Sequence, residues 1–303
     1  MSTFKIVTFD GGGVKGALSI RIFKRLCDRY PNLLDNVDLF AGTSTGSLIA
    51  LPLAYGLSPI EIDNFYSYKN TKYIFSPKRN NLFRPKYSNK HLAKIFLDYV
   101  PKETTLNDLK KYVLIPAFNV KGYTKPVWEI VFFNNLQDSA ISKTYALDAV
   151  LASCAAPTYF PSHKGFIDGG VIANSPTTPS IILSKSIFKN IEKFDDIKLL
   201  SIGTGDTPDY IKSNTTNWGI LQWAINSPFK IKTMILDVAL ERKVDLEDMY
   251  CNELLKNNYF RINPTLHSTI TLDDYKRVHE LKEVGDSIDL STAYKFIENI
   301  FLK

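Results

Sequence analysis

Residues 37–51 read VDLFAGTSTGSLIAL, and this stretch decides the fold. An apolar, strand-like run ends at Gly42-Thr43-Ser44-Thr45-Gly46, and a second apolar run follows at once. A strand that ends in Gly-x-Ser-x-Gly and turns directly into a helix is a nucleophile elbow. The glycines leave room for a tight, strained turn. Because that turn holds the hydroxyl at a helix N-terminus, where developing negative charge is favoured, the pattern predicts Ser44 as a nucleophile.

Two glycine motifs elsewhere in the sequence provide candidates for the base and the oxyanion donors, which an elbow alone does not contain. Asp10–Gly16 reads DGGGVKG and follows the strand-like run Phe4–Phe9, and Asp168-Gly169-Gly170 follows Phe166-Ile167. An ester hydrolase needs a nucleophile, a base and donors for the oxyanion. A glycine run lets a carbonyl oxygen come within hydrogen-bond range of backbone N–H groups, each worth about 3–4 kcal/mol in the transition state.

In this order, the three motifs resemble the patatin-like phospholipase family, which is marked by Asp-Gly-Gly-Gly-x-[Arg/Lys]-Gly, Gly-x-Ser-x-Gly and a distant Asp-Gly-[Gly/Ala]. One departure is Thr45, where many members carry alanine. The resemblance covers nearly the whole chain. It extends over four further segments: Ala152–Pro161, Val171–Pro176, Ser201–Gly205 and Asn257–Ile262.

The resemblance implies a three-layer α/β/α fold with a mostly parallel central sheet. It also implies a Ser–Asp dyad, with Ser44 as nucleophile and Asp168 as general base. The oxyanion hole would be formed by the N–H groups of Gly11, Gly12 and Gly13, and Thr45 would add its own, as in α/β-hydrolases. An acyl-Ser44 intermediate follows from this chemistry, and the same aspartate would activate water for deacylation.

An aspartate is a demanding choice of base. Its ordinary pKa is about 3.9, so it accepts a serine proton poorly near neutral pH unless burial raises that pKa. We therefore expect Asp168 to be desolvated.

Other interpretations of the same residues stay open. The glycines of Asp10–Gly16 also satisfy a dinucleotide-binding fingerprint, but the acidic residue required after the next strand is missing, since Asp35 and Asp38 precede that strand or start it. The glycine run can equally be a structural turn. A histidine-assisted triad in the order Ser, acid, His remains possible with His267 or His279, and His163 lies near Asp168 in sequence.

The chain of 303 residues is expected to form a single domain over 1–303, with residues 232–303 supplying C-terminal helices that pack on the core. Three cysteines and the absence of metal-ligand spacing argue against a disulfide framework, a metal or another cofactor. Five strand-like runs alternate with helical or irregular stretches: Phe4–Phe9, Val37–Ala41, Tyr112–Phe118, Val127–Phe133 and Leu199–Ile202.

Charge is concentrated in one segment. The net charge is +6, but residues 69–94 carry eight Lys and Arg with no Asp or Glu, interleaved with Tyr73, Phe75, Phe83 and Tyr87. Basic residues bind anionic lipid headgroups and aromatic residues favour the headgroup zone. We expect residues 69–111 to form a basic, lid-like segment that contacts an anionic membrane peripherally rather than nucleic acid. A solvated loop and helix face is the alternative.

The start of the chain shows no signal-peptide pattern, so a soluble, cytoplasmic protein is expected. The uncharged stretch Leu39–Ile60 is long enough to span a bilayer, but a strand followed by a buried helix explains it better. The sequence as a whole predicts a lipid acyl hydrolase that cleaves phospholipids or other glycerolipids. The alternative is a non-catalytic or ligand-activated lipid-binding module on the same fold.

Overall fold

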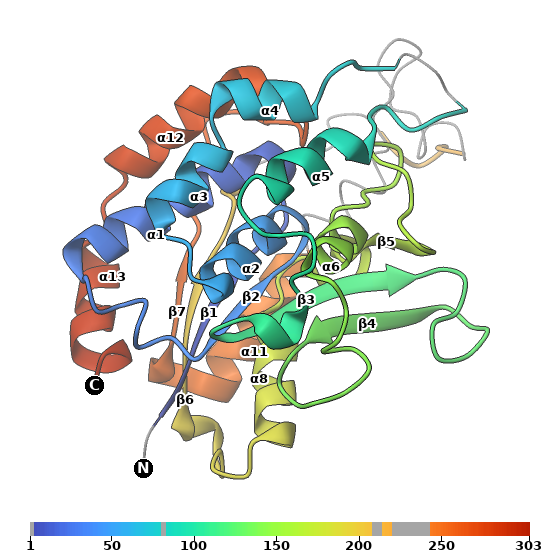
Figure 1. Ribbon diagram of the computed structural model, residues 1–303. Helices are drawn as coiled ribbons and strands as arrows, with labels where there is room; N and C mark the ends of the chain where they lie inside the picture. The colour runs from blue at the N-terminus through green and yellow to red at the C-terminus, as the bar shows by residue number, and fades with distance from the viewer. Residues whose placement is uncertain (1–2, 80–82, 208–213, 220–242) are drawn as a thin grey trace.

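The computed structural model describes residues 3–79, 83–207, 214–219 and 243–303 (Figure 1). Its centre is a sheet in the order β4-β3-β2-β1-β6-β7, with β5 paired to β3. The strands β1, β2, β3, β6 and β7 run parallel, whereas β4 and β5 are antiparallel to β3. Their bounds are β1 Phe4–Phe9, β2 Leu39–Gly42, β3 Tyr112–Asn119, β4 Glu129–Asn134, β5 Phe166–Asp168, β6 Ile197–Ile202 and β7 Tyr259–Ile262.

Helices cover both faces of this sheet, and β1 shows why they must. All six of its residues are buried, so neither face of the strand meets water. Val7 and Phe9 belong to one hydrophobic cluster, while Phe4 and Ile6 belong to a second. Because side chains alternate along a strand, the two clusters lie on opposite faces of the sheet.

The first cluster packs against α1 (Gly16–Arg29), α2 (Ser47–Tyr55), α6 (Ala146–Ser153) and α12 (Val278–Ser287). The second packs against α8 (Thr177–Ile187) and α11 (Lys243–Leu255). This is the expected three-layer α/β/α arrangement. The remaining helices are α3 Pro59–Phe65, α4 Tyr68–Ile74, α5 Asn89–Leu97, α7 Gly170–Ala173, α13 Ser291–Phe296 and the π-helix Ile297–Phe301, with short 3₁₀ turns between elements.

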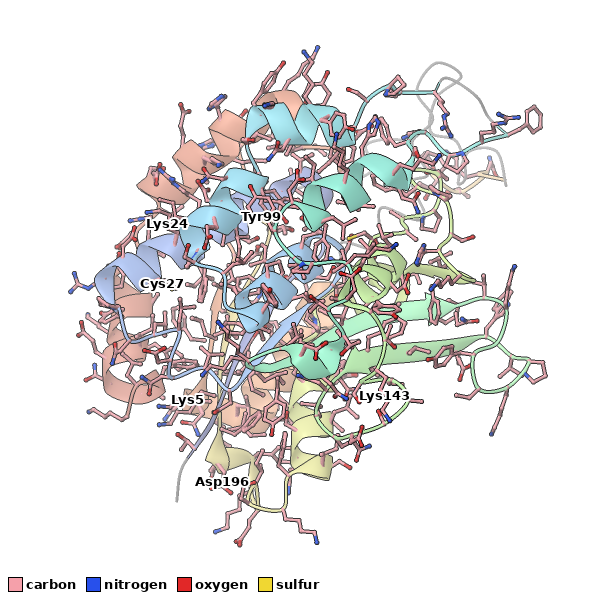
Figure 2. All side chains as sticks on the ribbon, viewed as in Figure 1. Lys5, Lys24, Cys27, Tyr99, Lys143 and Asp196 are labelled. Carbon is pink, nitrogen blue, oxygen red and sulfur yellow. The ribbon has the colours of Figure 1, made fainter. Side chains whose placement is uncertain are left out.

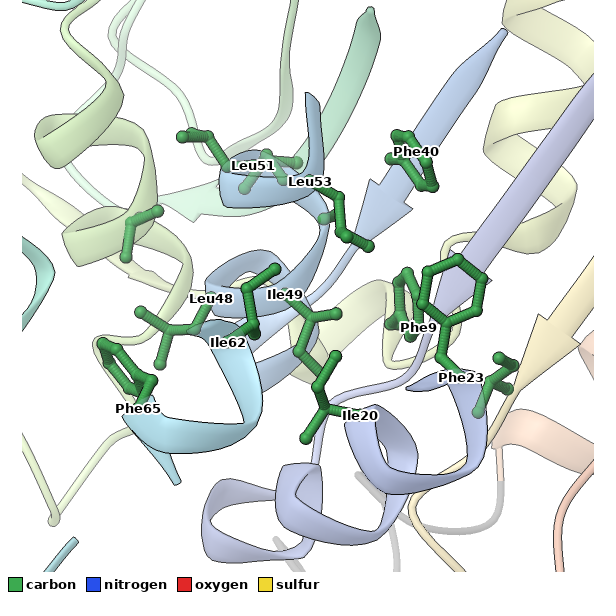
Figure 3. Packing of buried hydrophobic residues seen from close by; sticks show 14 of the residues in the cluster. Phe9, Ile20, Phe23, Phe40, Leu48, Ile49, Leu51, Leu53, Ile62 and Phe65 are labelled. Atoms are coloured by element: carbon green, nitrogen blue, oxygen red, sulfur yellow. The ribbon is translucent and has the colours of Figure 1, made fainter. Parts of the chain in front are cut away.

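Helix α2 lies in the centre of the first hydrophobic cluster. Figure 3 shows Ile49 of α2 facing Ile20 of α1, with Phe9 of β1 beside Phe23. The Phe9 and Phe23 rings meet edge to face, with centroids 5.3 Å apart. Since eight of the nine residues of α2 are buried, this helix holds the residues that precede it in a fixed position.

The sequence predictions for these elements are largely confirmed. The five strand-like runs correspond to β1, β2, β3, β4 and β6, whereas β5 and β7 are not among those runs. The uncharged stretch from Leu39 divides into β2, a 3₁₀ turn at Ser44–Gly46 and α2. In the part of the chain that the structure describes, no helix is long and apolar enough to cross a membrane.

Two other predictions concern the C-terminal third and the cysteines. Helices α11, α12 and α13 fall within residues 232–303, but residues 232–242 lie outside the described part of the chain. Cys27 on α1 (Figure 2), Cys154 and Cys251 are all free thiols. The chain therefore has no disulfide bond, as the odd number of cysteines suggested.

Candidate active site

Ser44 occupies a strained turn between β2 and α2. Its φ is 51°, a left-handed conformation that serine rarely adopts. The two glycines of the elbow are sterically required, because a Cβ on Gly42 would lie 2.0 Å from the carbonyl oxygen of Gly46, and one on Gly46 would lie 2.2 Å from that of Phe9. The turn can therefore form only with glycine at both positions, as the motif predicted.

Hydrogen bonds hold the backbone of Ser44 on both sides. Its N–H donates to Ser153 Oγ at 2.9 Å, and the Ser153 hydroxyl donates to the Pro116 carbonyl of β3 at 2.7 Å. Its carbonyl accepts from the Ser47 hydroxyl at 2.6 Å and from Cys154 Sγ at 3.2 Å. Sequence reasoning missed these roles. The only signal was the family-like segment Ala152–Pro161, which did not say what each residue does.

Asp168 lies directly against Ser44. It ends the short strand β5, pairs with Ala117 of β3, and is buried. Its carboxylate accepts a hydrogen bond from the N–H of Gly170 at 2.7 Å, and the Ser44 side chain lies near enough to the same carboxylate to influence its pKa. Burial raises the pKa of Asp168 to about 6, although the nearby Ser44 hydroxyl and the N–H of Gly170 both act in the opposite direction. The desolvation that a basic aspartate requires is therefore present.

The glycine loop follows β1 and closes over the same site. The N–H of Gly11 donates to the Asn174 carbonyl at 2.9 Å, and the Gly11 carbonyl accepts from Thr204 Oγ1 at 3.0 Å. Gly11 thus fixes the loop through bonds to its own backbone. By contrast, the N–H groups of Gly12, Gly13 and Thr45 have no hydrogen-bond partner within the described residues.

A buried ion pair anchors the start of this loop. Asp10 accepts from Arg261 of β7 at 2.5 Å, and Arg261 also donates to Ser201 Oγ of β6 at 2.7 Å. Both partners lie almost entirely out of water, with side chains 3% and 12% exposed. Since a buried charge is tolerated only when it is paired, Asp10 ties the glycine loop to the neighbouring strands.

Tyr66, just after α3, supports the elbow from the other side. Its hydroxyl lies 2.6 Å from Thr45 Oγ1 and donates to the Thr45 carbonyl at 2.9 Å. Burial raises the pKa of Tyr66 well above its ordinary value, so its hydroxyl stays protonated as a donor. The threonine that departs from the common family alanine is thus part of a specific contact.

An apolar cavity of about 50 Å³ opens onto Ser44. Ser44, Gly13 and Thr45 lie on its wall, so the nucleophile candidate and two residues with unpaired N–H groups line the same cavity. Most of the rest of the wall is hydrophobic, including Leu48, Phe65, Ile74, Phe75, Leu92 and Phe160.

The basic segment supplies part of that wall. Ile74 and Phe75 at the end of α4 and Leu92 of α5 line the cavity, while Lys72, Lys90 and Lys94 on the same helices are exposed. The aromatic residues of the segment divide in the same way. Phe75 and Tyr87 are buried, Tyr73 is half-buried, and Phe83 is exposed; residues 80–82 lie outside the described part of the chain.

The alternative site residues lie elsewhere. Among the described residues no histidine hydrogen-bonds Ser44 or Asp168: His163 bonds Asp148 at 2.7 Å and His91 bonds the Tyr73 carbonyl. Asp38 accepts from the N–H of Lys5, at the end of β1 away from the glycine loop. The nucleotide-binding interpretation is thereby disfavoured, because its acidic residue cannot reach a ligand on that loop.

Comparison with known proteins identifies the family to which this chain belongs. The family model described as patatin-like phospholipase matches residues 7–181. Protein teg of Priestia megaterium is 30% identical over 98% of this chain and 99% of its own length. The cGAMP-activated phospholipase of Vibrio cholerae is 29% identical over 89% of this chain and 85% of that protein. VipD from Legionella pneumophila, a solved structure, aligns at 14% identity with a TM-score of 0.42, covering 93% of this chain and 67% of that one. The chain belongs to the patatin-like phospholipase family and, with it, to the esterases and phospholipases.

Proposed function

We propose that this protein hydrolyses acyl esters of phospholipids or other glycerolipids through a Ser44–Asp168 dyad. The observation that carries the proposal is the strained Ser44 elbow at the wall of an apolar cavity, with its side chain close to a buried carboxylate whose pKa is raised to about 6. A base with a pKa near the working pH is best suited to general catalysis. Binding alone would not require a nucleophile and a desolvated base in contact.

In the first half-reaction, Ser44 Oγ attacks the ester carbonyl carbon and its proton passes to the Asp168 carboxylate. The negative charge moves to the carbonyl oxygen, where the N–H groups of Gly12, Gly13 and Thr45 would stabilise it. Collapse of this intermediate breaks the ester C–O bond, and the leaving alkoxide takes the proton from Asp168. The fatty-acyl group then remains on Ser44.

In the second half-reaction, a water molecule replaces the departed alcohol. Asp168 takes a proton from this water as it attacks the acyl carbonyl, and the proton returns to Ser44 Oγ as the fatty acid leaves. No outside oxidant, reductant or metal enters this balance. Asp10 and Arg261 act at a distance, since they hold the glycine loop rather than touch the substrate.

The substrate class follows from the cavity and from the surface around it. An apolar cavity favours a hydrocarbon chain, and the exposed cations on α4 and α5 favour an anionic headgroup or membrane. We assign residues 69–111 the role of a lid whose inner face lines the acyl site and whose outer face contacts the membrane.

The test is fatty-acid release from vesicles that contain an anionic phospholipid. Wild type is compared with Ser44→Ala and Asp168→Asn, each checked for folding by circular dichroism. We expect release by the wild type and its loss in both variants. Full activity in Ser44→Ala would contradict the proposal. A wild type that binds vesicles without hydrolysing any ester would favour a lipid-binding module instead.

A further inference from the structure

The hairpin that joins β3 to β4 carries a group of four exposed apolar side chains. Trp128 is 74% exposed and Val127 is 55% exposed, and Tyr123 and Ile130 are also exposed. These residues fall within eight positions of the sequence, and a second exposed apolar group, Leu246, Met249 and Tyr250, lies on α11. A group of this kind at one tip marks an interaction site more often than chance exposure.

The hairpin tip is held in a defined conformation by side-chain contacts. Glu129 accepts hydrogen bonds from the N–H groups of Tyr123 and Thr124 and from the Thr124 hydroxyl, at 2.5, 2.6 and 2.8 Å. These contacts, led by the one from the Thr124 backbone, lower the pKa of Glu129. The Trp128 ring packs edge-on against Phe118 of β3, with centroids 6.5 Å apart. The apolar side chains are therefore presented on an ordered support.

The base of the hairpin is joined to a segment that lines the acyl cavity. The N–H of Val120 donates to the Gly165 carbonyl at 2.9 Å, which joins the hairpin to residues 158–165. On the other side of those residues, the N–H of Lys86 donates to the Thr158 carbonyl. Tyr159 and Phe160 in this segment line the cavity. The hairpin base and the basic segment thus contact opposite ends of residues 158–165, and the hairpin projects outward from this part of the molecule (Figure 1).

The charged side chains that the tip offers to a binding partner are cationic. Lys121 and Lys125 are exposed on the hairpin. The acidic groups nearby are already engaged: Glu129 binds the N–H groups of its own hairpin, and Asp148 pairs with Lys164 and His163. Across the 158–165 segment, Arg79 and Arg84 are exposed as well. A partner that is both apolar and negatively charged fits this surface.

We propose that the β3–β4 tip, residues 121–130, is the apolar anchor by which the protein docks on an anionic membrane. Trp128 and Val127 enter the headgroup region, while Lys121 and Lys125 lie at the level of the phosphates. The sequence suggested the aromatic residues of the basic segment for this role, but two of those four point into the protein. The inference rests on the proposed function in one respect: a lipid substrate gives the docking its purpose.

The experiment measures co-flotation with vesicles of equal parts phosphatidylcholine and phosphatidylglycerol. The parent is Ser44→Ala, so that binding does not depend on hydrolysis. We expect the parent with the two further substitutions Val127→Ser and Trp128→Ala to bind vesicles about tenfold more weakly. The substitutions remove the apolar side chains that would be buried in the membrane. Lys121→Glu with Lys125→Glu should weaken binding to these vesicles and leave binding to pure phosphatidylcholine nearly unchanged.

The matched control is Met249→Ser on α11, an apolar residue that is 52% exposed away from the tip. It should bind as the parent does. The proposal would be overturned if the Val127→Ser, Trp128→Ala variant bound vesicles as well as the parent does. It would also be overturned if the parent did not bind vesicles. A tip that contacts another protein instead of a membrane would give equal vesicle binding by the parent and the variant. In the active background, the tip variant should keep its rate on a water-soluble short-chain ester and lose rate on vesicles only. This separates a failure of docking from a failure of catalysis.

Discussion

Replacing Asp168 by asparagine should change the pH dependence of stability in a way that is calculable from the structure. Burial raises the pKa of this carboxyl from 3.8 to about 6 in the folded protein. Between these values the folded state holds a proton that the unfolded state has released. The free energy of unfolding therefore falls as the pH rises through this window. Above it Asp168 is fully ionised, and the folded protein is destabilised by the whole desolvation penalty of the buried charge.

The magnitude follows from the size of the shift. Each pH unit of difference corresponds to 1.36 kcal/mol, so a shift of about two units gives about 3 kcal/mol. Asparagine has nearly the same shape and does not titrate. The free energy of unfolding of Asp168→Asn, minus that of the wild type, should increase by about 2.5 kcal/mol between pH 4 and pH 8, because part of the shift lies below pH 4.

The assay is urea denaturation of both proteins across this pH range, followed by circular dichroism. Any constant effect of losing the contact with Ser44 appears at every pH and cancels in the comparison. The variant should also lose activity by a factor of about 10²–10⁴, the usual contribution of a general base. A difference in stability that does not vary with pH would refute the reasoning, because it would mean that Asp168 is not desolvated.

Three further predictions concern the same site. First, kcat/KM on a soluble ester should rise with pH and level off above about 6, since the base must be unprotonated and its pKa is about 6; a profile that is flat from pH 4 to 8 would argue against Asp168 as base. Second, Gly46→Ala should destabilise the fold by about 3 kcal/mol or more, because its Cβ would lie 2.2 Å from the Phe9 carbonyl oxygen; unfolding in urea measures this, and a cost near zero would contradict the steric argument. Third, Ser153→Ala leaves the Ser44 N–H and the Pro116 carbonyl without their partner, so we expect a loss of about 1–3 kcal/mol and a fall in kcat with little change in KM; a variant with wild-type kcat would show that this bridge does not position the nucleophile.

The elbow and the sheet could be predicted from sequence because each depends on local pattern. Gly42 and Gly46 are required by contacts within the turn itself and with the adjacent strand, and the strands β1, β2 and β6 are buried along their whole length. The position of Asp168 beside Ser44 depended on the resemblance to a family. Nothing in residues 166–170 alone distinguishes a site from an ordinary turn.

What could not be predicted depends on distant contacts. Ser153 and Tyr66 form hydrogen bonds with elbow residues that lie 109 and 21 positions away in sequence. Neither residue stands in a local sequence pattern that predicts such a bond. The same holds for Arg261, which pairs with Asp10 over 251 residues. The exposed Trp128 was placed in a strand by its apolar neighbours, and only the structure shows that its side chain lies at the surface.

The most direct test of the account is to find the residue that forms the covalent intermediate. An alkyl fluorophosphonate reacts with an activated serine, and mass spectrometry of the digested protein locates the adduct. We predict one adduct per chain, on Ser44, formed much more slowly in Asp168→Asn and absent in Ser44→Ala. An adduct on another residue, or ester hydrolysis that persists in Ser44→Ala, would contradict the assignment of Ser44 as the nucleophile.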